Sequence, residues 1–231
     1  MIIDRPRAED IPGLRHLWQQ AFGDTDAYLD IFFRVGFAPE RCRCIRQEKA
    51  VTAALYWFDC SWGSKKIAYI YAVATDKAYR GQGLCRSLME STHKQLKSED
   101  YAGAVLVPVK PELSAMYAKF GYRGFCPLEK ATGEKPQATA ISPEEYMALR
   151  QERLSDDAIL QGSTALGLLA AYGGFYKTEN AIFCGYQEED VFHFEEIIGQ
   201  LPAQREAFSE AMYLSLDSAD TLPQYFAIPL N

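Results

Sequence analysis

The feature that most constrains the fold is an uncharged run that leads at once into a glycine-containing loop and a change of periodicity. Residues 67–75 carry no charge and are rich in β-branched and aromatic side chains, which is typical of a strand covered on both faces. After Gly83, apolar residues recur at helical spacing as far as Leu96. These patterns together predict a strand, a loop and a helix that begins at the glycines.

The loop has the composition of an anion-binding turn. Gly81 and Gly83 leave backbone N–H groups uncovered at the start of the helix, where the helix dipole adds roughly half a positive charge. Arg80 and Arg86 add attraction for the same anion, so a diphosphate group is the expected ligand. A glycine before a helix is more often turn chemistry alone, and the neighbouring residues have to decide.

The neighbouring residues resemble the GNAT N-acetyltransferase superfamily. Its cofactor motif is Arg or Gln, two residues, Gly, one residue, then Gly or Ala, and residues 80–85 of this chain read Arg-Gly-Gln-Gly-Leu-Cys. Cys85 departs from the motif but is small enough for close approach to pyrophosphate. A second signature, a tyrosine four residues before a Gly-aromatic pair, is matched by Tyr117, Gly121 and Tyr122. Two motifs in the right order are far more specific than either alone.

The resemblance implies an α/β (α+β, mixed-sheet) GNAT acyl-CoA N-acyltransferase fold over residues 1–128. The patterns predict two opening helices, antiparallel strands at about 41–46, 51–62 and 65–75, and a helical crossover to a parallel strand at about 102–107. Pro108 then lies where the two central strands of the family part to admit the pantetheine arm. An ordinary strand end is the alternative interpretation.

The rest of the chain is predicted to form a polar linker over 129–140 and a smaller α/β domain over 141–231. The predicted elements of this second domain are helices ending near 153 and covering 164–172, strands over 181–186 and 191–198, a helix over 203–213 and a strand over 225–230. This order partly repeats that of the first domain, so the segment is interpreted as a truncated GNAT-like half. Chance agreement of a common order is the alternative.

The chemistry implied by the resemblance is direct transfer of an acetyl group from acetyl-CoA, a co-substrate, to a primary amine, without a metal. The expected cofactor-binding residues are Val73, Ala74 and Thr75 in the strand and Arg80, Gly81, Gln82, Gly83, Leu84, Cys85 and Arg86 in the loop and helix. The backbone amides of Val73 and Thr75 would bind the pantetheine arm and the thioester carbonyl.

Tyr117 is the predicted general acid for the departing CoA thiolate, since a phenol with an ordinary pKa near 10 holds its proton at neutral pH. Simple packing of its helix against the sheet is the alternative. The general base stays open, because residues 67–75 contain no carboxylate. Asp59, Glu112, a water chain or the terminal carboxylate of Asn231 are the alternatives.

The opening helices border the acceptor site in this family, so Trp18, Tyr28, Phe32 and Phe33 are candidates to line it, although aromatic residues at helical spacing are more often core. A small-molecule or peptide amine is the expected acceptor. The alternative function is a non-catalytic acyl-CoA-binding module or sensor on the same fold.

The composition excludes several classes of partner. A formal charge of −7 without a basic stripe argues against nucleic acid and mildly suits a cationic substrate. The acidic start of the chain lacks the apolar region of a signal peptide, and no apolar run approaches membrane-spanning length, so a soluble, cytoplasmic protein is expected. The six cysteines show no Cys-x-x-Cys spacing, so no metal site is expected. The sequence leaves the oligomeric state open.

Overall fold

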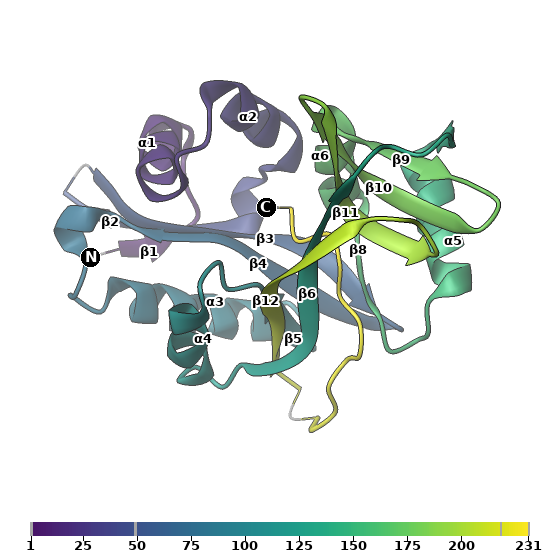
Figure 1. Cartoon of the computed structure of the whole chain (residues 1–231). Coiled ribbons are helices and arrows are strands. Elements are labelled where there is room, and N and C mark those ends of the chain that lie inside the picture. Colours follow the sequence, from purple (N-terminus) through teal and green to yellow (C-terminus); the bar gives the residue numbers. More distant parts are fainter. Residues whose placement is uncertain (1, 49, 218, 231) are drawn as a thin grey trace.

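The computed structural model describes residues 2–48, 50–217 and 219–230, and a long mixed sheet runs through them (Figure 1). Its strands are β1 (Ile2–Asp4), β2 (Cys42–Gln47), β3 (Ala50–Trp62), β4 (Lys65–Thr75), β5 (Gly103–Leu106), β6 (Arg123–Gly133), β7 (Thr139–Ile141), β8 (Ile159–Gln161), β9 (Gly174–Lys177), β10 (Ala181–Glu188), β11 (Val191–Gly199) and β12 (Gln204–Ser215). They are hydrogen-bonded in the order β1-β2-β3-β4-β5-β12-β6-β11-β10-β9-β7, and β8 pairs with β3.

Helices cover both faces of the sheet. They are α1 (Ile11–Phe22), α2 (Asp26–Ile31), α3 (Leu84–Ser98), α4 (Pro111–Ala118), α5 (Pro143–Arg153) and α6 (Ser163–Tyr172). Helix α2 continues into a π-helical segment, Phe32–Gly36. In Figure 1, α1 and α2 lie on one side of β3 and β4, and α3 and α4 lie on the other. This arrangement confirms the predicted mixed α/β fold.

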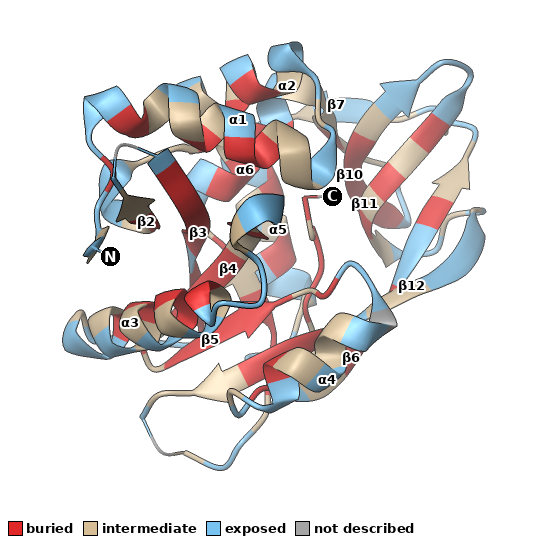
Figure 2. Cartoon of the chain, turned by 90° about the vertical axis from the view of Figure 1, so that its left-hand side faces the viewer, coloured by how far each residue is buried: buried red, intermediate tan, exposed pale blue. Residues whose placement is uncertain are grey.

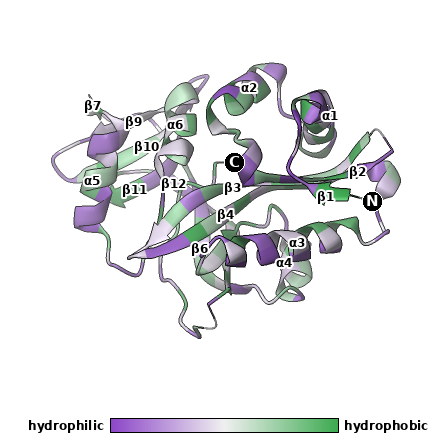
Figure 3. Ribbon diagram, turned by 180° about the vertical axis from the view of Figure 1, so that it is seen from behind, coloured by the Kyte–Doolittle hydropathy of each residue, from purple (hydrophilic) through white to green (hydrophobic). Residues whose placement is uncertain are grey.

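The central strands divide their side chains between two cores, as a strand covered on both faces must. In β4, Ile67 and Tyr69 join the core beneath α1, α2 and α6, whereas Ala68 and Ile70 join the core above α3. Figure 2 shows β3 and β4 buried along much of their length, and Figure 3 shows their middle parts to be hydrophobic. The uncharged run is therefore a buried central strand, as predicted.

Strands β4 and β5 part early. Their parallel pairing covers Ile67 with Gly103, Ala68 with Ala104 and Tyr69 with Val105, and β5 ends at Leu106 while β4 continues to Thr75. The register of β4 against β3 also shifts after Tyr71, and Ala72 there has a φ of +49°. The ladder has therefore stopped before Pro108, and a gap opens in the middle of the sheet.

Two predictions about the later part of the chain differ from the structure, and three strands there were not predicted. The segment 203–213, predicted as a helix, lies in strand β12 from Gln204 onward, and β12 is inserted between β5 and β6. Pairing with two distant strands outweighs local helical spacing there. The strand predicted over 225–230 is reduced to one bridge from Tyr225 to Ala158, because Ile228 and Leu230 have left-handed backbones, with φ of +56° and +59°. Strands β7, β8 and β9 were not predicted.

The segment predicted as a linker carries strand at both ends. Residues 129–133 belong to β6, and Thr139–Ile141 forms β7. The helices ending at Arg153 and covering Ser163–Tyr172, and strands β10 and β11, agree with the predicted elements. The division into a domain over 1–128 and a second one over 141–231 stays a prediction.

Within the described ranges, no helix has both the length and the apolar character required to cross a membrane.

Candidate active site

A cavity of about 670 Å³ opens where β4 and β5 part. Helices α1 and α2 form one wall, α4 and the residues after β5 form another, and α6, β10 and the C-terminal tail close the third side. The residues that line the cavity are Trp18, Phe22, Gly23, Asp24, Thr25, Ala27, Tyr28, Ile31, Tyr69, Ile70, Tyr71, Ala72, Val73, Leu106, Val107, Val109, Leu113, Tyr117, Tyr172, Tyr186, Glu188 and Leu230.

The predicted diphosphate loop precedes α3 and presents bare backbone. Gly81 and Gly83 have φ of +78° and +77°, and a Cβ built at either position meets no described atom within 4 Å. Gly83 is the N-cap of α3, and no described side chain caps this helix, so its first N–H groups face outward. Residues 80–83 are all exposed. This geometry fits a diphosphate group.

Arg80 in the loop and Arg86 in the first turn of α3 each have a partner in the structure. Arg80 donates from Nε to the carbonyl of Thr75 at 3.1 Å. Arg86 lies 3.5 Å from the carboxylate of Glu90, one turn further along α3. Both side chains start at exposed residues, so each can turn from its present partner toward an anion at the helix N-terminus.

Cys85, which departs from the family motif, turns its side chain away from the loop. The residue is half-buried and packs against the core beneath α3, and burial raises the pKa of its thiol. The thiol is therefore a small packing group, and the main chain of residues 80–83 before it stays exposed. The departure from Gly or Ala therefore does not close the loop that is predicted to hold the diphosphate.

The strand residues predicted to bind the cofactor lie at the parting of the sheet. Val73 lines the cavity, while Ala74 is buried opposite Ala54, and Thr75 pairs with Ala53. Pairing of β4 with β5 stops at Tyr69, so the edge of β4 from Ile70 onward faces the gap. Backbone amides on that edge are available to a ligand. Their hydrogen bonds to the pantetheine arm stay a prediction.

Tyr117 lies on α4 and lines the cavity with a side chain that is mostly buried; the whole residue is 7% exposed. Its ring packs against that of Tyr122, with centroids 6.0 Å apart. Burial, and to a smaller degree the nearby Cys85, raises the pKa of Tyr117, so its phenol stays protonated at neutral pH. The residue thus both packs the helix against the sheet and reaches the cavity.

The opening helices supply part of the predicted aromatic lining. Trp18 and Tyr28 line the cavity, and the indole N–H of Trp18 donates to Asp24 at 2.7 Å. Phe32 is fully buried in the core, with Phe33 packed against it, so these two rings are core residues.

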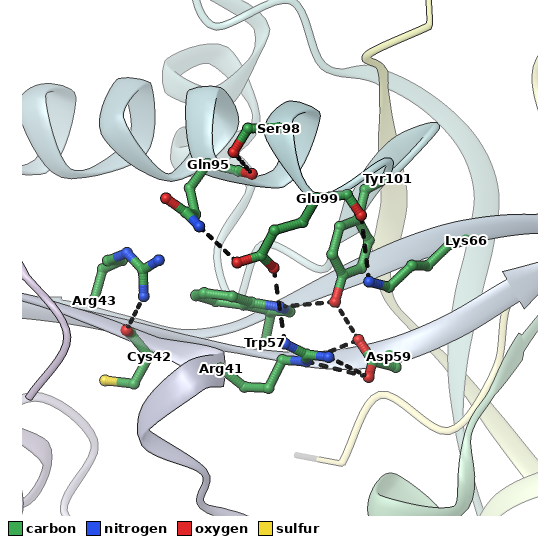
Figure 4. A network of polar contacts seen from close by, with 10 residues as sticks. All are labelled: Arg41, Cys42, Arg43, Trp57, Asp59, Lys66, Gln95, Ser98, Glu99 and Tyr101. Carbon is green, nitrogen blue, oxygen red and sulfur yellow. Dashed lines mark hydrogen bonds and ion pairs between the residues drawn. The ribbon is translucent and has the colours of Figure 1, made fainter.

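Two of the sequence-based candidates for the general base, Asp59 and Glu112, lie elsewhere. Asp59 accepts three hydrogen bonds from Arg41, two from Nε at 3.0 and 3.1 Å and one from Nη2 at 3.0 Å, and a fourth from the Tyr101 hydroxyl (Figure 4). Glu112 is exposed on the first turn of α4. Neither belongs to the described lining of the cavity. Asn231 lies outside the described residues.

Sequence reasoning raised the C-terminus only as one alternative for the general base and did not identify the tail as a wall of the cavity. The Tyr71 hydroxyl donates to the carbonyl of Leu230 at 2.6 Å, and the Tyr69 hydroxyl donates to the carbonyl of Pro229. The backbone N–H of Leu230 donates to Glu195 at 3.3 Å. Alternation along β4 places both tyrosines on one face, but nothing in the pattern indicates that the tail returns to them.

A buried ion pair holds the tail in place. The Arg150 Nε lies 2.7 Å from the Glu196 carboxylate, and both side chains are fully buried. Tyr146 and Tyr225 donate to the same carboxylate at 2.9 and 3.0 Å. Gln161 accepts from Arg150 and donates to the carbonyl of Ala227. The ion pair thus connects α5 and β11 to the residues that precede Leu230.

Comparison with known proteins places these features in a family. The family described as Acetyltransferase (GNAT) domain matches residues 3–125. A GCN5-related N-acetyltransferase from Kribbella flavida is 13% identical, with a TM-score of 0.70 over 94% of this chain and 71% of its own.

A second GCN5-related N-acetyltransferase, from Anabaena variabilis, is 15% identical, with a TM-score of 0.70 over 93% of this chain and 72% of its own. Eis1 from Mycobacterium abscessus is 9% identical, with a TM-score of 0.67 over 94% of this chain and 74% of its own. At these identities the likeness concerns the fold, which is shared over nearly the whole chain. None of the curated proteins compared with the sequence matches it.

Proposed function

The chain belongs to the GNAT acetyltransferase family and is an acetyl-CoA-dependent acetyltransferase, and we propose that it acetylates a primary amine of a small molecule or peptide, with Tyr117 as general acid. The observation that carries this proposal is that Tyr117 and the unpaired edge of β4 line the same cavity. A thioester held along that edge would have its sulfur within reach of the phenol.

Each part of the site has a role in this proposal. The open N-terminus of α3, with Gly81 and Gly83, holds the diphosphate of acetyl-CoA. Backbone amides of Val73 and Thr75 orient the thioester and stabilise the oxyanion of the tetrahedral intermediate. Tyr117 gives its proton to the departing thiolate. The amine enters from the side formed by Trp18, Tyr28 and the C-terminal tail.

The residues beyond 140 supply the far wall of the acceptor side. Tyr172 of α6, Tyr186 of β10 and Leu230 of the tail line the cavity opposite α2. The proposed second domain over 141–231 would therefore take part in choosing the amine. Aromatic walls with the carboxylates of Asp24 and Glu188 favour an amine that is cationic before it reacts.

Calorimetric titration with acetyl-CoA tests the cofactor site. We expect the wild type to bind acetyl-CoA with micromolar affinity. Gly83→Glu puts a side chain and a negative charge into the diphosphate loop, so this variant should not bind. Gly63→Glu is the matched control, because Gly63 also has a positive φ, +55°, and open space around it, but lies in the β3–β4 hairpin. Equal loss in both variants, or no binding by the wild type, would contradict the assignment of the loop.

A panel of amines, assayed for release of free CoA thiol, tests the activity itself. Turnover with at least one primary amine is the expected result. Binding of acetyl-CoA without turnover across the panel would favour the alternative, a non-catalytic acyl-CoA-binding protein.

A further inference from the structure

We infer that Glu195 is the group that takes the proton from the acceptor amine, through a bridging water molecule. The inference rests on the proposed function, since it names the base of that reaction. It arises from a bulge in β11, from the path of the C-terminal tail and from the charges that surround the cavity.

The bulge decides where Glu195 points. In the pairing of β10 with β11, Cys184 lies opposite Glu196 and Gly185 lies opposite Phe194, so Glu195 is an extra residue without a partner in the ladder. Such a bulge re-aims side chains relative to regular alternation. Glu196 reaches Arg150, and Glu195 reaches the tail. Two successive glutamates thus serve two different sites.

The tail connects Glu195, a half-buried residue that does not itself line the cavity, to a residue that does. Leu230 donates its backbone N–H to the Glu195 Oε2 at 3.3 Å, and the same Leu230 lines the cavity. The carbonyl of Leu230 accepts from Tyr71, whose hydroxyl lies 2.9 Å from that of Tyr28. Since Tyr71 has one hydroxyl hydrogen, Tyr28 is the donor in that second contact. One residue of the tail therefore connects Glu195 to two tyrosines of the acceptor side.

Titratable and charged groups on five elements interact electrostatically with Glu195. Burial is the main cause that raises the pKa of Tyr28 on α2, Tyr69 on β4, Tyr172 on α6 and Tyr186 on β10, and the charge of Glu195 raises it further. Lys130 on β6 is the cation that acts on Glu195, and its effect is smaller than that of burial. The tyrosines stay neutral at working pH, which leaves Glu195 as the titrating group among them.

Burial raises the pKa of Glu195 to about 7, although the Leu230 N–H and Lys130 lower it. A carboxylate with this pKa accepts a proton more readily than an ordinary glutamate and still releases it near neutral pH. The two carboxylates that line the cavity, Asp24 and Glu188, are less suited. Asp24 is occupied by the indole of Trp18, and Glu188 is 67% exposed and lies 3.3 Å from His193.

The proposed step balances as follows. The Glu195 carboxylate takes one proton from the ammonium form of the substrate, which leaves a neutral amine. The lone pair of its nitrogen forms the C–N bond to the thioester carbonyl carbon, and the C–S bond breaks when the tetrahedral intermediate collapses. The thiolate takes the Tyr117 proton. The second nitrogen proton returns to the Tyr117 phenolate through solvent, and Glu195 releases its own proton to solvent.

The test is the pH dependence of kcat/KM in Glu195→Gln, measured with an amine that the panel identifies. Gln keeps the size of the side chain and an oxygen for the Leu230 N–H. We expect kcat/KM to fall by about 10²- to 10⁴-fold, and the acidic limb near pH 7 to disappear, with acetyl-CoA affinity unchanged. Glu188→Gln is the matched control, because it removes a cavity carboxylate from β10 and should leave the limb in place.

A second variant distinguishes loss of the base from a folding defect. Glu195→Asp keeps the carboxylate and should retain the acidic limb and more activity than Glu195→Gln. If Glu195→Gln keeps wild-type kcat/KM and its limb, or if Glu188→Gln removes that limb, Glu195 is not the base. If the wild type binds acetyl-CoA but turns over no amine, the proposed function itself fails, and the inference fails with it.

Discussion

The hydroxyl of Tyr71 on β4 donates a 2.6 Å hydrogen bond to the carbonyl of Leu230, 159 residues further along the chain. The bond joins the central strand of the family domain to the tail that follows β12. Because Tyr71 and Leu230 both line the cavity, the tail forms one of its walls. The acceptor side of the site is therefore assembled from both ends of the chain.

Tyr71→Phe should loosen this wall. The Leu230 carbonyl and Tyr28 would each lose a partner, so we expect the free energy of unfolding to fall by about 1 kcal/mol and KM for the amine to rise several-fold. Affinity for acetyl-CoA should not change. Steady-state kinetics and denaturant titration check this. Tyr186→Phe is the control, since Tyr186 lines the cavity and stacks on His193. A similar rise in KM there would argue against the role of the tail.

Tyr117→Phe should separate chemistry from binding. Phe fills the same space in the core beneath α3 but has no proton to give, so we expect kcat to fall by roughly 10²-fold or more while acetyl-CoA binds as before. Tyr122→Phe is the control, because Tyr122 packs on Tyr117 but its hydroxyl bonds to His93. This variant should keep the wild-type kcat. Unchanged kcat in Tyr117→Phe would leave Tyr117 with a packing role alone.

His93 should make the fold sensitive to mild acid. Burial lowers the pKa of His93 from 6.5 to about 4. Between pH 6.5 and 4, the unfolded chain therefore binds a proton on His93 that the folded protein does not bind. Stability is therefore full above about pH 6.5 and falls as the pH drops toward 4, by up to about 3 kcal/mol. Urea denaturation at several pH values between 7 and 4.5 measures the slope of the free energy of unfolding against pH.

His93→Gln keeps a partner for the Tyr122 hydroxyl, which lies 3.0 Å from the His93 Nε2, and should flatten that slope. His16→Gln, on the exposed face of α1, should leave it as in the wild type. An identical slope in the wild type and His93→Gln would assign the acid sensitivity to other groups.

Glu196→Gln should be strongly destabilising. It leaves the fully buried guanidinium of Arg150 without its counter-charge, which costs about 3–5 kcal/mol. Glu145→Gln removes an ion pair of similar length, 2.6 Å, whose side chains are both 44% exposed, and should cost less than about 1 kcal/mol. Thermal and denaturant unfolding of the two variants check the contrast. Equal losses of unfolding free energy in the two variants would mean that burial does not make the Arg150–Glu196 pair more important for stability.

The sequence by itself determined the parts of the site that depend on short stretches of chain. Positive φ at Gly81 and Gly83, the uncapped start of α3 and the burial of β4 on both faces follow from residues within a few positions of one another. Backbone conformation and hydrophobic period are local properties, so the loop and the element that carries Tyr117 could be predicted. The gap between β4 and β5 was expected only from the resemblance to the family.

The tertiary structure decided the rest. Local spacing in residues 203–213 favoured a helix, but edges left free by β5 and β6 made the segment a strand. The position of Leu230 beside Tyr71, and the bulge that turns Glu195 to the same tail, depend on contacts between residues far apart in sequence. Such contacts are set by which surfaces the whole chain can bury together, and no window of sequence contains that information.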